Sequence, residues 1–234
     1  MPQTWTIVPK KFALRAHCRQ DICAPSDRWR IFCAIELPEP VRSLVLRHIA
    51  YLKEVVPQAR ASWARDANLH LTLKFLGEIP QTSVSDFSRV ASRAVAGVQP
   101  FSIHLEHTGV FPTHGQPRVL WLGINDLSGE LGELHARLER ESAQAGFAKE
   151  ARPFHPHLTI ARLRKPDNAR ALAVAHKQME FEPMEIAVTE LVVIRSELSS
   201  EGSKHTVVSR HALVPRPERP TVNSHVPKGV DQEP

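Results

Sequence analysis

No run of about 18 consecutive apolar residues occurs in the 234-residue sequence, so no membrane-spanning helix is predicted. Residues 1–28 are basic and polar and lack the apolar core of a secretory signal. Only three cysteines occur, Cys18, Cys23 and Cys33, and their spacing matches neither a zinc site nor a disulfide framework. These absences predict a cytoplasmic protein with reduced thiols.

Two common catalytic motifs are also missing. The sequence has no HExxH pair of metal ligands and no phosphate-binding P-loop. The segment "GELGEL" belongs to a helical stripe of leucines and provides no phosphate cradle, so use of ATP is not supported. We therefore expect no cofactor.

The net charge of +5 is unevenly distributed along the chain. Residues 1–30 hold six basic and two acidic side chains, and residues 215–234 hold three of each, so residues 31–214 carry only +1. Any contact with nucleic acid must then depend on local groups and not on a broad basic face. We expect a disordered basic extension over 1–28, a folded domain over 29–214, and a disordered Pro-rich tail over 215–234.

Strands and helices alternate irregularly within the expected domain. The patterns predict strands at 30–37, 69–76, 100–112, 117–124, 157–161, 184–196 and 204–214. They predict helices at 40–57, around 84–94, at 127–147 and at 166–179. Hairpins between several of these strands favour an α+β fold over a doubly wound parallel sheet.

The triplet His-Leu-Thr occurs twice, each time within a strand pattern. It is found in "NLHLTLKFLGE", residues 68–78, and in "FHPHLTIAR", residues 154–162. Alternation along a strand places His70, Thr72 and Lys74 on one face, with Leu71, Leu73 and Phe75 in the core. His157 and Thr159 should likewise share a face.

Chance must be weighed against this repetition. With 13 histidines in the chain, chance supplies about 0.6 His-x-Thr triplets. A half-exposed strand with polar groups on its wet face is also common. Two identical triplets in strand contexts, one in each half of the chain, nevertheless favour a functional role.

Two imidazoles and two hydroxyls that converge on one groove would suit the hydrolysis of a phosphodiester. One neutral imidazole can take a proton from water while a protonated one gives a proton to the leaving alcohol. An unperturbed pKa near 6.5 would let both forms coexist near neutrality. Threonine hydroxyls can donate to the phosphate oxygens on which negative charge accumulates.

The two long motifs, together with the opening "WRIFCAIELP", resemble the two-histidine phosphoesterases. The resemblance is strongest to the RNA 2′,3′-cyclic phosphodiesterases, also called 2′-5′ RNA ligases, and extends from about Trp29 to Val214. It implies a bilobal, pseudo-twofold arrangement of two antiparallel-rich sheets, with helices outside and a groove between the lobes. The implied reaction opens a terminal 2′,3′-cyclic phosphate of RNA or an oligonucleotide to a 2′-phosphate without a metal.

The resemblance also implies a role for each motif residue. His70 matches the proton donor and His157 the proton acceptor, with Thr72 and Thr159 as phosphate ligands. Arg162 matches a phosphate-contacting arginine. We expect no obligate protein partner, no membrane association and a monomer.

Four positions depend on details that a strand pattern does not specify. Strict alternation from His157 places Arg162 on the core side, so it reaches the groove only if the strand ends or bulges near Ala161. Phe154 and Trp121 are candidates for stacking on a nucleobase, although a core role fits both. His205 stands in the closing hairpin at a position where the family commonly has an aromatic residue.

Other interpretations of the same residues remain open. His155 and His157 could both ligate a metal, but no Cys or acidic residue in the motifs supplies a third ligand. His104, His107 and His114 suggest a similar metal site, but a histidine in a loop is usually just solvated. The chain could also be an RNA-end-binding module without turnover, or act mainly as a reversible 2′-5′ RNA ligase.

Overall fold

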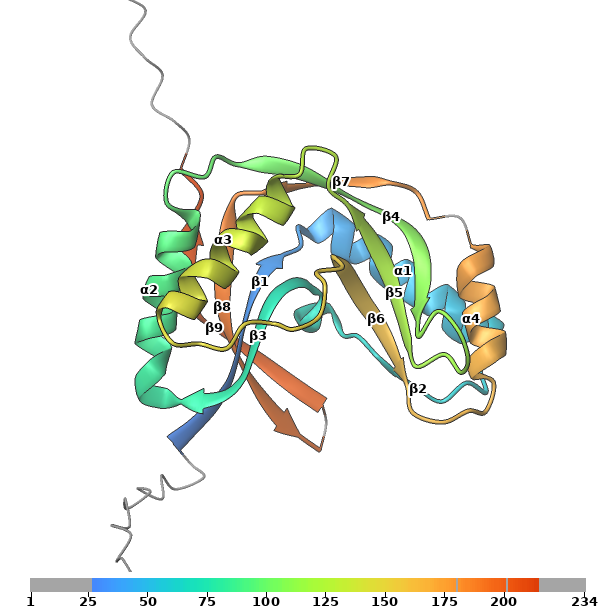
Figure 1. Ribbon diagram of the computed structural model, residues 1–234. Coiled ribbons are helices and arrows are strands. Elements are labelled where there is room, and N and C mark those ends of the chain that lie inside the picture. The colour runs from blue at the N-terminus through green and yellow to red at the C-terminus, as the bar shows by residue number, and fades with distance from the viewer. Residues whose placement is uncertain (1–26, 180, 201, 215–234) are drawn as a thin grey trace, which may run out of the picture.

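The computed structural model describes residues 27–179, 181–200 and 202–214, which fold into two antiparallel sheets (Figure 1). The four-stranded sheet has the order β3 (His70–Pro80), β1 (Arg28–Glu36), β8 (Glu190–Ser199) and β9 (Gly202–Ala212). The five-stranded sheet has the order β2 (Ala61–Trp63), β6 (His157–Leu163), β5 (Val119–Asn125), β4 (Phe101–Phe111) and β7 (Met184–Val188). Every neighbouring pair is antiparallel.

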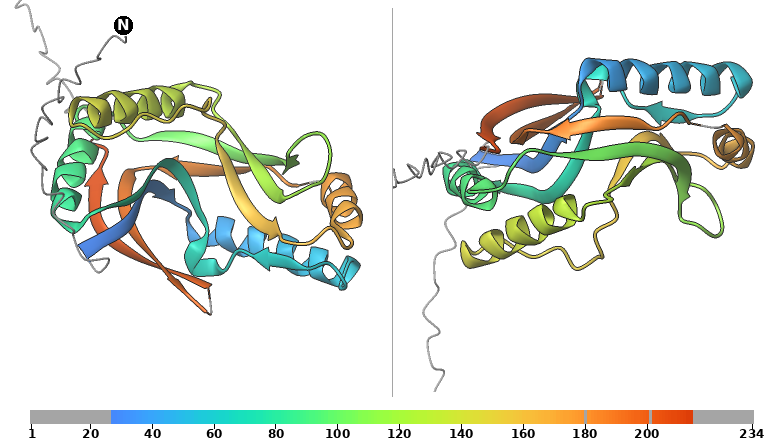
Figure 2. Two further views of the ribbon diagram at one scale, coloured as in Figure 1. Left: turned by 60° about the horizontal axis from the view of Figure 1, so that its bottom comes forward. Right: turned by 90° about the horizontal axis from the view of Figure 1, so that it is seen from above.

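Two pairs of helices flank the sheets. Helices α2 (Val84–Val95) and α3 (Glu130–Gln144) pack together over the four-stranded sheet, and α1 (Glu39–Val55) and α4 (Ala169–Gln178) pack together beside the five-stranded sheet (Figures 1 and 2). Two single-turn 3₁₀ helices, η2 (Asp66–Asn68) and η3 (Gln81–Ser83), flank β3. The apolar stripe of α2 shows the helical spacing expected from the sequence, because Val84, Phe87, Val90 and Ala94 are all buried.

The two sheets repeat one pattern. In the four-stranded sheet β3 lies beside β1, which lies beside β8, and in the other sheet β6 lies beside β5, which lies beside β4. The strands that carry the two His-Leu-Thr triplets, β3 and β6, are therefore equivalent within these three-strand units, although β3 is the edge of its sheet and β6 has β2 on its other side. One apolar core extends through both halves. The expected α+β, two-sheet architecture is confirmed.

The stretch 184–196, predicted as one strand, is two strands in different sheets. β7 ends at Val188 and pairs with β4, whereas β8 begins at Glu190 and pairs with β1 and β9. The alternating pattern runs through Thr189 without a glycine or proline, so no local signal marks the crossing. The three-residue strand β2 was also missed, because three residues are too few for periodicity to show.

The described residues span the expected domain of 29–214, and the bounds of that domain stay a prediction. Arg28, placed in the basic extension, is the first residue of β1 and pairs with Pro80. Residues 1–26 and 215–234 lie outside the described part of the chain, so the expected extension and tail fall almost wholly there. No helix within the described ranges is long and apolar enough to cross a membrane.

Two buried histidines join α1, α4 and β5. His176 Nε2 lies 3.0 Å from the carbonyl oxygen of Trp121, which can only accept, so this nitrogen carries the proton. His176 Nδ1 then accepts a hydrogen bond from His48 Nε2 over 2.9 Å. His48 and His176 are 2% and 0% exposed. Burial and the neighbouring His176 lower the pKa of His48 to about 4, so the chain of hydrogen bonds is built for neutral rings.

We predict that His48→Leu destabilises the protein at pH 7.5 by about 1–3 kcal/mol, because it leaves a buried acceptor on His176 without a partner. The stabilisation from neutral His48 is fully present above the unfolded pKa near 6.5 and is lost as pH falls toward 4, because the unfolded chain binds the proton more readily. Urea unfolding at pH 7.5 and pH 5 measures this. The difference in free energy of unfolding between wild type and variant should be smaller at pH 5 than at pH 7.5. An equal difference at both pH values would contradict the prediction.

Candidate active site in the groove between the sheets

One groove of about 1080 Å³ lies between the two sheets. Side chains from β1, β3, β6 and β9 line it, together with the loop that precedes β6. All six residues selected from the sequence line this groove, namely His70, Thr72, Phe154, His157, Thr159 and Arg162. The two triplets, 87 positions apart in the sequence, therefore meet at one site.

The first triplet is presented by β3, whose alternation is interrupted by a bulge. His70 and Thr72 are half-buried at the groove, and Leu71 is buried in the core. The register with β1 then shifts, since Ala34 pairs with Thr72 but the preceding Cys33 pairs with Lys74. The extra residue reverses the faces of the residues that follow.

This bulge corrects two expectations. Lys74 was expected beside His70 on the wet face but is 3% exposed, whereas Phe75 was expected in the core and is 48% exposed. Lys74 Nζ donates to Glu139 Oε1 over 2.6 Å and to the carbonyl oxygen of Ala148 over 2.9 Å. Phe75 lies at the groove instead, with its ring 5.5 Å from that of Phe32.

The second triplet has the same bulge at the same place. Trp121 pairs with Thr159, but the preceding Leu120 pairs with Ala161, so Ile160 is the extra residue. Ile160 and Ala161 are both buried, and Arg162 is exposed and lines the groove. From the sequence, Arg162 reaches the groove only if the strand ends or bulges near Ala161. The observed bulge allows this.

His70 lies in a cluster of rings. Its imidazole stacks on Phe32, with ring centroids 4.7 Å apart, and meets His205 edge-on at 5.1 Å. Burial and the nearby His205 lower the pKa of His70 to about 4, against a smaller upward effect of a hydrogen bond to the backbone of Asn68. The free protein therefore holds His70 mainly neutral at pH 7, unlike the unperturbed pKa assumed from the sequence.

His157 has a defined tautomer. Its Nδ1 lies 2.7 Å from the carbonyl oxygen of His155, so Nδ1 donates and Nε2 has its lone pair available when the ring is neutral. Burial lowers the pKa of His157, and Arg162 and His155 lower it further, against the opposing effect of this hydrogen bond. The exposed His155 thus orients His157 through its backbone.

The groove concentrates positive charge that the whole domain lacks. Its described lining contains six basic side chains and a single carboxylate, Glu150. Glu150 is bonded to Arg152, and Lys74 is paired with Glu139. The other basic groups of the lining are Arg30, Arg65, Arg162 and Arg164. The sequence predicts that any contact with nucleic acid depends on local basic groups, and the groove contains such a group of side chains.

The aromatic candidates have different positions. Phe154 lines the groove, and one face of its ring stacks on His135 with centroids 3.9 Å apart. Trp121 is not among the lining residues; its indole packs against the backbone of Gly109, where a Cβ would come within 2.1 Å of it. Phe111, whose ring lies 5.1 Å from that of His157, lines the groove in that region instead.

Several lining residues were missed by the sequence analysis, chiefly Phe32, Phe75, Arg30, Arg65 and Arg164. For Phe75 no signal was available, because the bulge has no sequence marker. Across the described residues, no group of three or more His, Cys, Asp or Glu side chains is arranged to hold a metal ion.

Comparison with known proteins gives consistent matches. Residues 38–199 match the profile described as "2'-5' RNA ligase superfamily". The RNA 2′,3′-cyclic phosphodiesterase of Escherichia coli K12 is 32% identical over 189 residues, which cover 80% of this chain and 98% of that protein. The enzyme of the same name from Methanothermobacter thermautotrophicus is 33% identical over 178 residues, covering 76% and 95%.

Solved structures agree with the sequence matches. A Thermus thermophilus protein superposes with a TM-score of 0.63 at 29% identity, covering 79% of this chain and 97% of its own. Escherichia coli LigT without ligand has a TM-score of 0.63 at 28% identity, covering 80% and 98%, and LigT has also been solved with 3′-AMP. From the matched profile and these relatives, the chain belongs to the 2′-5′ RNA ligase superfamily, among the RNA 2′,3′-cyclic phosphodiesterases.

Proposed function

We propose that this protein hydrolyses the 2′,3′-cyclic phosphate ends of RNA or oligonucleotides to 2′-phosphates, by general acid and base catalysis without a metal ion. One observation carries the proposal: two His-Leu-Thr triplets on equivalent strands line one groove. The names of the curated relatives support the same substrate class.

His157 is proposed to activate the water. Its Nδ1 donates to the carbonyl of His155, so the neutral ring has a lone pair on Nε2 that can take a proton. A lowered pKa keeps that ring neutral at pH 7. The water oxygen then attacks phosphorus as its proton passes to Nε2.

His70 is proposed to protonate the departing O3′ as the P–O3′ bond breaks. Its pKa of about 4 in the free protein leaves few molecules with this ring charged at neutrality. A bound phosphodiester anion raises the pKa, since a negative charge nearby favours the imidazolium form. The substrate thus helps to charge its own proton donor.

The phosphate is proposed to be held by Thr72, Thr159 and Arg162. The two hydroxyls lie on equivalent strands, two positions beyond each histidine, and donate to non-bridging oxygens. The Arg162 guanidinium balances the charge that builds on those oxygens in the transition state. Phe154, which lines the groove, is proposed to stack on a nucleobase.

We predict that His70→Ala and His157→Ala each lower kcat/KM for a 2′,3′-cyclic phosphate substrate by on the order of 10²-fold or more, in buffer with EDTA. Thr72→Ala and Thr159→Ala should cost less, because the other hydroxyl and Arg162 still hold the phosphate. Binding without turnover by the wild type would identify an RNA-end-binding module. Activity lost in EDTA and restored by a divalent ion would contradict metal independence.

We predict a bell-shaped dependence of kcat/KM on pH with its maximum between about pH 4 and 6.5, because His70 titrates near 4 and His157 below 6.5 in the free protein. The profile of kcat, which reports the substrate complex, should fall at higher pH than that of kcat/KM, since bound phosphate raises both pKa values. Initial rates from pH 4 to 9 at low and saturating substrate test this. A flat kcat/KM profile would exclude the paired histidines.

We predict that every product ends in a 2′-phosphate, because the proton donor His70 is assigned to O3′. Chromatography against authentic 2′- and 3′-monophosphates distinguishes the two outcomes. A predominantly 3′-phosphate product would reverse the assigned geometry, even if both histidines proved essential. Joining of RNA ends in the same reaction, when a 5′-hydroxyl oligonucleotide is added, would instead favour the ligase activity.

A further inference from the structure

The groove face of β6 continues past the second triplet as a row of two arginines. Arg162 and Arg164 are both exposed and both line the groove, while Leu163 between them is 8% exposed. They are therefore successive same-face positions along one extended segment, with Arg164 immediately after the end of β6.

The spacing of these two arginines suits a strand of nucleic acid. Two residues along an extended chain span about 7 Å. Neighbouring phosphates of an extended RNA strand are separated by a similar distance. If Arg162 contacts the reacting phosphate, Arg164 lies one phosphate farther along the groove.

Arg164 is available to a ligand. Within the described ranges it takes part in no ion pair or side-chain hydrogen bond, whereas Arg152 is bonded to Glu150, the one carboxylate of the groove lining. Apart from Glu150, the described lining of the groove contains no carboxylate that could neutralise the charge of Arg164.

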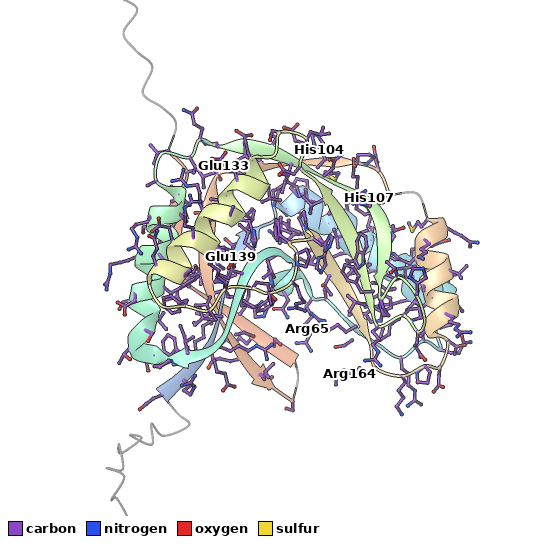
Figure 3. The ribbon with its side chains drawn as sticks, in the orientation of Figure 1. Arg65, His104, His107, Glu133, Glu139 and Arg164 are labelled. Carbon is purple, nitrogen blue, oxygen red and sulfur yellow. The ribbon has the colours of Figure 1, made fainter. Side chains whose placement is uncertain are left out.

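A second cation of the groove lining, Arg65, lies nearer the second triplet, because the backbone N–H of the preceding Ala64 donates to the carbonyl oxygen of Ile160 over 2.8 Å. The Arg65 guanidinium lies against the tip of the β8–β9 hairpin, 3.6 Å from the position that a Cβ on Gly202 would take. Figure 3 labels Arg65 nearer the β8–β9 hairpin and Arg164 nearer the lower end of β6. The groove, at about 1080 Å³, also exceeds the roughly 300–1,000 Å³ of a pocket for one small ligand.

We propose that Arg164 binds the phosphodiester immediately 5′ of the cyclic phosphate. This inference rests on the proposed function and narrows its substrate to oligonucleotides with at least one internal phosphodiester. A cyclic mononucleotide reaches the histidines but leaves this subsite empty.

The test compares three substrates: uridine 2′,3′-cyclic phosphate, a uridine dinucleotide with the same cyclic end, and that dinucleotide with a neutral methylphosphonate linkage. The wild type should prefer the phosphodiester dinucleotide over the methylphosphonate by roughly tenfold in kcat/KM, the scale of one charged hydrogen-bonded contact. Arg164→Gln should reduce this preference to about 1. It should also make the slope of log(kcat/KM) against log(salt) shallower by about 0.7 for the dinucleotide.

Two control variants separate the subsite from the catalytic groups. Arg162→Gln should lower the rate on all three substrates and preserve the preference between the linkages. Arg47 is an exposed arginine of α1 that does not line the groove. Arg47→Gln removes one positive charge, as Arg164→Gln does, and should preserve the preference between the linkages.

The possible outcomes are distinct. Hydrolysis of all three substrates with equal efficiency by the wild type would overturn the subsite and leave the proposed function standing. Retention of the full preference for the charged linkage by Arg164→Gln would likewise overturn the subsite alone. Hydrolysis of none of the substrates would overturn both proposals.

Discussion

The contents of the groove depend on one extra residue in each of the two equivalent strands. A regular strand that buries Leu71 and shows Thr72 must bury Phe75 as well, because side chains alternate. The bulges at Leu73–Lys74 and at Ile160–Ala161 break that rule at the same distance from each histidine. Each strand consequently presents its histidine, its threonine and the residue five positions beyond the histidine. In β3 that residue is Phe75, and in β6 it is Arg162.

The first bulge has a cost that α3 offsets. It turns Lys74 into the interior, where an unpaired ammonium would be unfavourable by several kcal/mol. Glu139 of α3 pairs with it, and the other oxygen of Glu139 accepts a hydrogen bond from the backbone of Glu150 over 3.1 Å. Lys74 also bonds Ala148. The same few contacts therefore anchor β3, the strand of the first triplet, to the loop that leads into β6, the strand of the second.

The two histidines are equivalent in position but not in surroundings. His70 packs against Phe32 and His205, and its charged form is disfavoured in the free protein. His157 is oriented by a backbone carbonyl and lies near Arg162. A near-symmetric fold can in this way give one imidazole the role of base and the other the role of acid, because burial and neighbouring charges act on each ring separately.

The sequence by itself determined the positions of most strands and helices, the α+β class, and the two His-Leu-Thr triplets that line the groove. These features can be predicted because hydrophobic periodicity and the spacing within a motif depend only on residues that are close together in the sequence. Only the tertiary structure decided the crossing at Thr189, the burial of Lys74, the exposure of Phe75, and the gathering of arginines along the groove. Each of these depends on pairing between distant strands, since a bulge exists only in relation to a partner strand and a charge cluster only after the chain has folded.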